Sequence, residues 1–514
     1  MRSMSVRKSG NFAWNSCKEL MRNLAYSLIG IGLLFIAFFA LADFLGLGGD
    51  SGIGATQLLG IQIGALAVFL GIGLLTTKWD EKSNFRKKFQ LSSVLNSSTL
   101  YWVLGAFLIT YILFFLLPVF FSRQQIHYLT KYIPDAYITR IGFDIEAIVS
   151  RIEAWLRTGQ SPYADGFIAY PPLAIAIFAT FSIIGYPAYF KLIVVITVLA
   201  YLLVALIIPL LILPNRSRIL LMLFFVTGLF SYGLQFEQER GQFNLITFML
   251  CLNAIYIFHF HHKFRYYAYL LFSLSIQLKV YPVFFVVMFV SDWRDWRNNI
   301  KRILGLGIAN FLLLFVLGYR LFLDFVKTIT NYQLLESSRY ENLSIKGFAY
   351  YLSNEVFESA QQNFFASANN SETFFWLLLG LCFLLAVGYV YFRNERGLNP
   401  YLLLISTIAA LIIPSVSNDY KLSLLITPMM LTLGGLPELP KNGNKIFLLL
   451  LVGLASLAYW TTLYPATVKP DFMGRNFPAL IVILISATVL QFLAPYTYEG
   501  RAQEPAAILS SNHE

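Results

Sequence analysis

The sequence predicts an all-α, polytopic membrane protein. Of its 514 residues, 57% are hydrophobic and only 13% are charged, whereas soluble domains carry about 25% charged residues. Apolar runs of about 20 residues, the length of a helix that spans a bilayer, recur from Leu24 to Leu493. These runs do not alternate between polar and apolar residues, so they do not match the strands of a membrane barrel.

The charges are distributed as in a multi-pass membrane protein. The formal net charge is +11, and the basic residues lie in short loops between the apolar runs. Such loops face the cytoplasm under the positive-inside rule, so we expect a cytoplasmic N-terminus and no nucleic-acid partner. The three cysteines are scattered, which indicates neither a disulfide framework nor a metal site.

The apolar runs predict about 13–14 transmembrane helices in a plasma or inner membrane. We expect a basic segment with two additional helices in 1–95, a membrane domain in 96–495, two extracytoplasmic loop regions (122–188 and 324–372), and a disordered cytoplasmic tail in 496–514. The apolar segments are 23–45, 53–76, 100–121, 171–186, 189–213, 218–236, 243–261, 266–290, 302–323, 374–392, 399–416, 420–436, 445–464 and 477–494.

Two of these segments conflict with the charge rule if they cross the membrane fully. A helix that lies in the outer leaflet resolves the conflict for 171–186, because such backbone is tolerated where protein covers it. Segment 266–290 is interrupted by Lys279, and Pro282 disfavours a helical conformation at Tyr281. We therefore expect two short helices that turn near Lys279, with a single kinked span as the alternative.

The stretch Phe143–Leu173 lies in the first long polar interval and begins with an amphipathic helix. Its apolar residues follow the i, i+3, i+4, i+7 spacing of one helical face, and Gly159 suits its C-terminal cap. Asp144 lies in the first turn, where spacing alone favours an N-cap that accepts hydrogen bonds from free backbone N–H groups. The functional alternative is a carboxylate that acts as a general base at the membrane boundary. The apolar face consists of Ile145, Ile148, Val149, Ile152, Trp155 and Leu156.

Further polar residues interrupt apolar runs on the same expected face of the membrane. Glu239 and Arg240 precede Gln242 and Asn244, two amides that enter an apolar run and need hydrogen-bond partners there. Lys279 is an ionisable group in an apolar stretch, which is costly and marks a functional site by default. Its alternative is a lysine that snorkels to the interface.

Asn418-Asp419-Tyr420-Lys421, between two spans, adds another acid and another cation, unless it is only a turn. Together these clusters offer acids and amides for a hydroxylated substrate and cations for a phosphate. The sequence contains no phosphate-binding loop of the GxxxxGK type. This favours a lipid-phosphate donor over a soluble nucleotide donor.

Seven motifs occur in order along the chain: Asp144, Gly159, Pro162-Tyr163, Tyr170-Pro171-Pro172-Leu173, Gly241-Gln242-Phe243-Asn244, Lys279-Val280-Tyr281-Pro282 and Asp419-Tyr420. This series resembles the polyprenyl-phosphate-mannose-dependent mannosyltransferases of glycosyltransferase family 87, which have the GT-C fold. The resemblance covers roughly residues 95–495, so the two N-terminal helices look like an addition. Asn418 stands where the family often has His, a departure that bears on donor or acceptor specificity.

The resemblance implies a glycosyl donor on a polyprenyl phosphate and transfer with inversion to a lipid-linked or glycan acceptor at the extracytoplasmic face. It implies that Asp144 is the general base and that Gln242, Asn244 and Lys279 lie near the donor. Membrane lipids are the other expected partners, and we expect no cofactor and assign no metal ligand. The cations Arg240 and Lys421 complete the predicted phosphate-binding set, and the predicted substrate-binding set is Tyr163, Tyr170, Glu239, Tyr281, Asp419 and Tyr420.

Two other functions stay open from the sequence. An O-antigen-type polymerase or ligase also has many spans and large external loops, and would use essential arginines in 324–372. A transporter or flippase would show internal repeats and charges at mid-membrane. The halves of this chain show no convincing repeat, and the ionisable residues gather at one face.

Overall fold

The computed structural model describes most of the chain from residue 142 onward and one helix before it. The described residues are 3–41, isolated positions between 64 and 112, 142–186, 188–213, 218–335, 342–356, 365, 367–435 and 472–493. Most of the predicted segments 53–76 and 100–121, all of 445–464, and the tail 496–514 lie outside this set. The chain divides into two units, Met1–Lys131 and Tyr132–Glu514, and each is described by itself.

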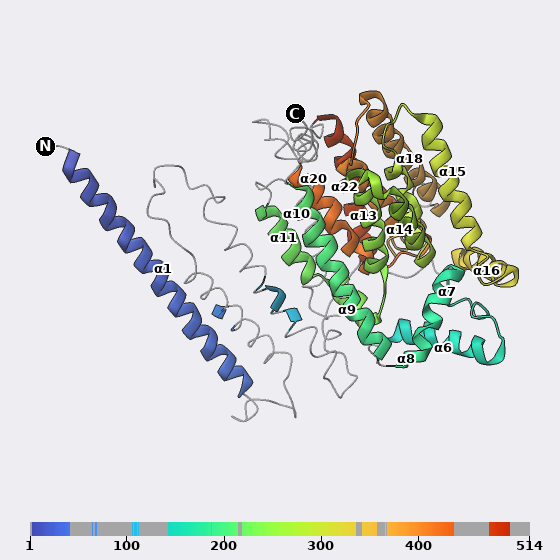
Figure 1. Ribbon diagram of the computed structural model, residues 1–514, viewed down its shortest axis with the longest axis horizontal. Coiled ribbons are helices and arrows are strands. Elements are labelled where there is room, and N and C mark those ends of the chain that lie inside the picture. The colour runs from blue at the N-terminus through green and yellow to red at the C-terminus, as the bar shows by residue number, and fades with distance from the viewer. Residues whose placement is uncertain are drawn as a thin grey trace, which may run out of the picture. The chain divides into compact units, whose positions relative to one another are not determined.

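In the first unit, α1 (Ser3–Ala40) is a single long helix (Figure 1). Its stretch Arg22–Phe39 is long and apolar enough to span a membrane. The helix therefore continues through the basic segment that precedes the predicted span at 23–45, and it ends at Ala40.

The second unit is built from helices, which confirms the predicted all-α class. Its described part contains one isolated β-bridge, between Asn342 and Asn418, and no strand. The elements are α6 (Phe143–Thr158), α7 (Pro172–Ala179), α8 (Phe181–Ile184), α9 (Ala188–Leu202), η3 (Leu203–Ile207), α10 (Ile208–Ile212), α11 (Arg218–Leu229), α12 (Tyr232–Arg240), α13 (Asn244–Phe260), η5 (His262–Phe264), α14 (Arg265–Leu278), η6 (Tyr281–Phe289), α15 (Trp296–Leu313), α16 (Tyr319–Leu335), α17 (Ile345–Tyr351), η7 (Leu352–Val356), α18 (Ala368–Arg393), α19 (Pro400–Ile412), η9 (Asp419–Leu425), α20 (Ile426–Gly434) and α22 (Phe472–Leu493).

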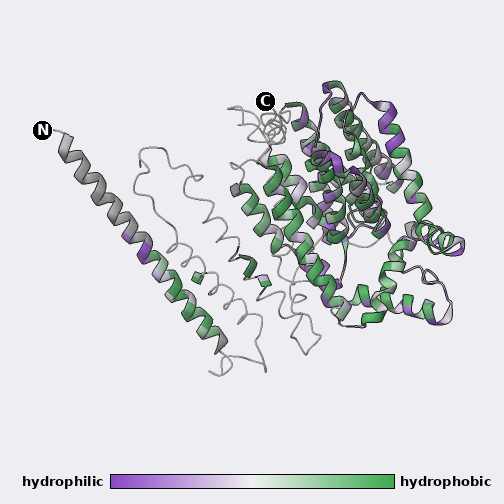
Figure 2. Ribbon diagram, in the orientation of Figure 1, coloured by the Kyte–Doolittle hydropathy of each residue, from purple (hydrophilic) through white to green (hydrophobic). Residues whose placement is uncertain are grey.

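The long apolar helices identify an integral membrane protein. Figure 2 shows α9 and α11 as largely hydrophobic. Among the described residues, four helices are long and apolar enough to cross a membrane, or five if α11 and α12, bent by 40°, form one span. The predicted total of about 13–14 spans extends beyond the described residues and stays a prediction. The four helices are Arg22–Phe39, Ala188–Ile212, Ala368–Arg393 and Asn476–Leu493.

The core of the second unit surrounds α13 and α19. Every residue of α19 is buried, and this helix packs against η6, α18, α20 and α22. The α13 helix packs against α9 and α14. This packing holds the ends of α13 and α19 in place, and polar residues lie at those ends.

Segment 266–290 forms two helices, α14 and η6, as predicted from its polar interruption. Lys279 between them is extended (φ −148°, ψ 143°), and Pro282 lies in the first turn of η6, where its missing N–H is tolerated. The ring centroids of Phe272 in α14 and Phe289 in η6 lie 4.3 Å apart, so η6 turns back along α14 and the segment is not a single kinked helix.

The predicted span at 302–323 is not one continuous helix, and whether it crosses the membrane stays a prediction. The α15 helix ends at Leu313, and α16 begins at Tyr319. Gly318 between them has a φ of 94°, a conformation that only glycine adopts readily.

Segment 171–186 forms two helices, α7 and α8, of eight and four residues. Both are shorter than the about 20 residues that a full crossing needs. The α7 helix packs against α6, α14 and α16, and Figure 1 shows α6 to α8 gathered at one end of the second unit. Their position in the outer leaflet stays a prediction.

Two glycines let α6 lie directly against the end of α12. Gly142, before α6, has a φ of 78°, and its N–H donates to the Glu239 carbonyl over 2.6 Å. Gly241, after α12, has a φ of 68°, and a Cβ there would lie 2.5 Å from Cγ2 of Ile145. This contact brings Asp144 beside the turn between α12 and α13.

We expect Gly241→Ala to destabilise the protein more than Gly159→Ala, the matched control. Both positions have positive φ, but a Cβ at Gly159 would meet no atom within 4 Å. The control carries only the backbone strain of about 1–2 kcal/mol, whereas Gly241→Ala adds overpacking of about 1–3 kcal/mol. Thermal unfolding of the purified protein in detergent measures the difference, and equal unfolding temperatures would contradict the close packing.

Candidate functional site

Four polar side chains form a continuous hydrogen-bonded chain where α6, α13 and α14 meet. Oδ2 of Asp144 accepts from Nε2 of Gln242 over 2.6 Å. Oε1 of Gln242 accepts from Nζ of Lys279 over 2.9 Å, and the same ammonium donates to Oδ1 of Asn244 over 2.6 Å. One amide therefore joins a carboxylate to an ammonium group that lies far away in the sequence.

Asp144 is not the N-cap of α6, so that interpretation is wrong. Gly142 occupies the cap position in a left-handed conformation, and no side chain caps the helix. The other oxygen of Asp144, Oδ1, lies 3.4 Å from Nη1 of Arg240, and the Asp144 side chain is 18% exposed. The carboxylate thus faces the turn between α12 and α13, and part of it is accessible.

Lys279 is buried among amides and aromatic rings, with 7% of its surface exposed. Its Nζ lies 4.5 Å from the ring centroid of Phe243 and 5.4 Å from that of Tyr170, which adds cation–π attraction. The snorkelling alternative is wrong, because the ammonium points into the protein. An ammonium group has three N–H donors, and the two amide oxygens use two of them.

Glu237 fixes the first turn of α13, a role that the sequence analysis did not assign. It is fully buried. Its Oε1 accepts from the Leu245 N–H over 2.6 Å, a position where the helix dipole favours an anion. The Tyr281 hydroxyl donates to the Asn244 carbonyl over 2.7 Å. These two contacts orient the amides of Gln242 and Asn244. The available signal was an acid at the border of an apolar run.

A cavity of about 940 Å³ opens beside this chain of hydrogen bonds. This volume is near the upper end of the range of about 300–1,000 Å³ for small-molecule sites. Of the predicted site residues, the cavity is lined by Asp144, Tyr170, Arg240, Gln242, Lys279, Tyr281, Tyr420 and Lys421. Asn244, Glu239 and Tyr163 are buried behind the wall, and the side chain of Asp419 lies outside the described part.

The cavity also takes residues that the sequence analysis did not single out. Lys346 comes from α17, and Asn369, Glu372 and Trp376 come from the first turns of α18. All four lie in or next to the predicted external region 324–372. Polar residues are ordinary in such a region, so the sequence contains no signal that separates them from their neighbours.

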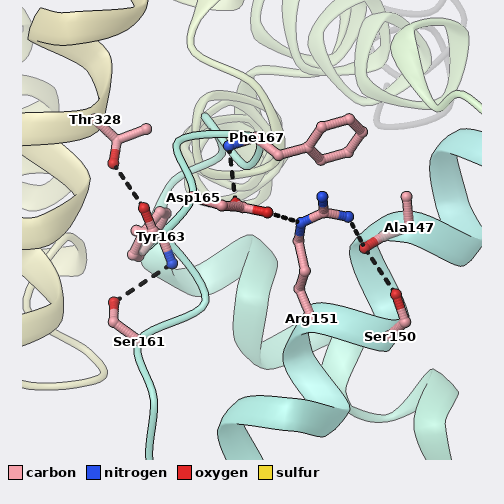
Figure 3. Close-up of polar contacts among 8 residues, drawn as sticks. All are labelled: Ala147, Ser150, Arg151, Ser161, Tyr163, Asp165, Phe167 and Thr328. Atoms are coloured by element: carbon pink, nitrogen blue, oxygen red, sulfur yellow. Dashed lines mark hydrogen bonds and ion pairs between the residues drawn. The ribbon is translucent and has the colours of Figure 1, made fainter.

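Polar contacts with α6, with α16 and within the loop hold the loop after α6, and Figure 3 shows several of them. Arg151 donates to Asp165 over 2.6 Å and to the Ala147 carbonyl over 2.9 Å. The Tyr163 hydroxyl donates to the Tyr170 carbonyl over 2.8 Å, and Thr328 donates to the Tyr163 carbonyl over 3.4 Å. Tyr163 thus holds in place the loop segment from which Tyr170 reaches the cavity.

The second external region is joined to the segment before η9. The Leu343 N–H donates to the Ser417 carbonyl over 2.6 Å. The Asn342 amide donates to the Ser415 carbonyl over 2.8 Å and accepts from the Ser417 N–H. This junction brings α17 beside η9, so that Lys346 and Lys421 line one cavity.

Two lysines outside the candidate spans have lowered pKa values: the buried Lys279, between α14 and η6, and the half-buried Lys421, in the first turn of η9. Burial lowers the pKa of Lys279; the nearby Lys421 ammonium adds to this effect, while the Glu237 and Asp144 carboxylates oppose it. Burial lowers the pKa of Lys421 to about 8, and Glu237 opposes this shift. A bound anion would favour the protonated form of both lysines.

The fold and the site define a polytopic membrane protein with a cavity in which carboxylates and several cations lie beside apolar side chains. The chain belongs to glycosyltransferase family 87, because residues 167–428 match the profile of that family. A search of the curated proteins finds no match. The protein is therefore a membrane glycosyltransferase, and its all-α architecture agrees with the expected GT-C fold. The matched region includes Gln242 and Lys279 but begins after Asp144.

We expect the affinity for farnesyl phosphate, a short isoprenyl phosphate, to fall as the pH rises from 7 to 9. The ligand is fully ionised above pH 7, since a phosphate monoester has a second pKa of about 6. Lys421, with a pKa lowered to about 8, loses its proton in this interval, and the lowered pKa of Lys279 acts in the same direction, so the dissociation constant should rise about tenfold or more. Equilibrium binding to the purified protein in nanodiscs measures it.

Lys421→Arg is the control for this pH dependence, because arginine keeps its charge throughout the interval. The variant should show a shallower loss of affinity than the original protein. An affinity that stays constant from pH 7 to 9 in the original protein would contradict the role of the two lysines as anion ligands.

Proposed function

We propose that this protein transfers a sugar, mannose in the first instance, from a polyprenyl phosphate to an acceptor hydroxyl with inversion. The observation that carries the proposal is the chain of hydrogen bonds from Asp144 through Gln242 to Lys279 at the wall of one cavity. It supplies a proton acceptor and a phosphate-binding cation within the reach of one glycosyl phosphate.

In the proposed reaction, Asp144 takes the proton of the acceptor hydroxyl as the acceptor oxygen forms a bond to C1 of the sugar. The bond between C1 and the phosphate oxygen breaks on the opposite side, and polyprenyl phosphate leaves with the bonding electrons. Positive charge develops on the sugar ring, as in glycoside hydrolysis. Lys279, Lys421 and Arg240 stabilise the negative charge that develops on the departing phosphate.

The walls of the cavity suit a lipid-linked donor. Apolar side chains that include Ile148, Phe167, Val280 and Phe284 line the same cavity as Lys279. An isoprenyl chain gains free energy when it packs against such walls, and its phosphate needs the cations. A nucleotide base would instead need hydrogen-bond partners on this apolar side.

We place the site on the extracytoplasmic side of the membrane, as the charge pattern predicts. Asn244 begins α13, and the basic residues of η5 follow its other end. A helix of 17 residues is roughly 25 Å long at about 1.5 Å per residue, close to the thickness of the hydrocarbon core. Basic loops favour the cytoplasmic side, which supports an external position for the opposite end.

We expect Asp144→Asn to lower the transfer rate by about 10²–10⁴-fold, the usual contribution of a general base. The amide cannot take up the proton, but it fills the same volume, so folding and farnesyl phosphate binding should persist. Asp165→Asn is the matched control, since Asp165 lies in the same external region and pairs with Arg151 away from the cavity. Full activity of Asp144→Asn would disprove the assignment.

We expect purified protein in nanodiscs to consume polyprenyl-phosphate mannose when lipid-linked or glycan acceptors are present, and to leave nucleotide sugars unchanged. The donor has a single sugar–phosphate bond, and one displacement at C1 inverts its configuration. NMR of the product therefore should show the anomer opposite to that of the donor. Transfer from a nucleotide sugar alone, or retention of configuration, would overturn the proposed donor or mechanism.

A further inference from the structure

The first turns of α18 present a polar face to the cavity on the wall formed with α17. Asn369, Glu372 and Trp376 are spaced i, i+3 and i+7, which places them on one side of the helix, and all three line the cavity. Phe374, which is also exposed, lies two residues from both Glu372 and Trp376, about 160° around the helix, and so on the opposite side. The helix therefore has one face for the cavity and another for lipid.

These three side chains have the chemistry of a carbohydrate subsite. Nε1 of Trp376 lies 3.4 Å from Oε1 of Glu372, and the Trp376 side chain is 41% exposed. A flat indole offers a large apolar face for the C–H groups of a sugar ring. A carboxylate accepts hydrogen bonds from sugar hydroxyls, and the amide of Asn369 both donates and accepts them.

The alternative explanation for Trp376 is a membrane anchor without a ligand, since tryptophan is enriched where helices leave the bilayer. Such a residue turns its ring toward lipid headgroups. Trp376 instead lines the cavity that also contains Asp144 and Lys279, and its indole N–H faces a carboxylate of the same wall. A cavity-facing tryptophan beside Glu372 is better explained by a ligand.

We propose that this face of α18 binds the acceptor and that the acceptor is a saccharide, with one sugar ring stacked on Trp376. The inference rests on the proposed function, in which Lys279 and Lys421 hold the phosphate of the donor. Since these lysines and the apolar wall serve the donor, the wall of Asn369 and Glu372 is left for a second, hydroxyl-rich molecule. An acceptor held there brings its hydroxyl into the cavity that Asp144 shares.

The test is the binding of simple methyl glycosides to the full-length protein in nanodiscs, followed by saturation-transfer NMR. The probes are methyl α-mannoside, methyl α-glucoside and methyl β-galactoside. We expect at least one of them to receive saturation at the C–H protons of one ring face. Trp376→Ala should weaken its binding at least tenfold, Trp376→Phe should keep most of it, and Glu372→Gln should weaken it in part. Phe374→Ala, on the opposite face of α18, is the matched control and should have no effect.

Farnesyl phosphate binding, measured on the same samples, separates this inference from the proposed function. The inference is supported if Trp376→Ala loses the glycoside but keeps farnesyl phosphate. It is overturned if no glycoside binds while farnesyl phosphate does, or if glycoside binding survives in Trp376→Ala. It is also overturned if Trp376→Ala loses farnesyl phosphate alone, since the ring would then pack against the donor chain. Failure of the wild-type protein to bind farnesyl phosphate would instead refute the donor assignment.

Discussion

The candidate site depends on the burial of one ammonium group. An unpaired charge in an apolar interior costs several kcal/mol or more, so Lys279 requires the amide oxygens of Gln242 and Asn244. Those amides are in position only because the α12–α13 turn is tight at Gly241 and is closed by the Glu237 carboxylate. The same turn receives α6 and with it Asp144. The cation, its amides and the carboxylate are consequently one structural unit, and none of them can move alone.

Short helices and the breaks between helices assemble this unit. The chain leaves the helical conformation between α12 and α13, between α14 and η6, and between α19 and η9. Each break frees backbone and polar side chains, which membrane proteins tolerate only where protein covers them or a cavity hydrates them. Here the breaks converge on one cavity, to which Lys279 and Lys421 both contribute. Polar groups are concentrated around the cavity because these breaks between helices meet there.

The sequence predicts the site residues that interrupt apolar runs, where a polar side chain is energetically unfavourable. It does not predict the site residues that lie in a polar region, where such side chains are common. Lys279 and Gln242 interrupt apolar runs, and a polar group there has few explanations besides a partner or a ligand. The contacts of Asp144 could not be predicted in this way, because an acid in the first turn of a helix favours an N-cap interpretation. The structure shows instead that Gly142, in a left-handed conformation beside α12, occupies the cap position. Glu372 and Trp376 lie in the first turns of a helix that follows a polar region of the sequence. Their residue types do not predict that their side chains line the cavity. The break within 302–323 was not predicted, because a single glycine, Gly318, does not interrupt the apolar pattern of this run.

Asn418 bears on the choice of the proton acceptor in the proposed reaction, because it lines the cavity as an amide. Its amide donates to the Tyr420 hydroxyl over 3.1 Å, and an amide has no proton affinity near neutral pH. Among the described residues that line the cavity, the carboxylates are Asp144 and Glu372, and none is a histidine. Glu372 lies against Trp376 on the α18 wall, whereas Asp144 is joined through Gln242 to the cation that would hold the leaving phosphate. In the proposed reaction, the acceptor oxygen loses its proton as it attacks the sugar carbon that the phosphate leaves, so a base near the cation that holds the phosphate suits this step. The hydrogen bonds to Gln242 therefore favour Asp144 over Glu372 as the proposed base.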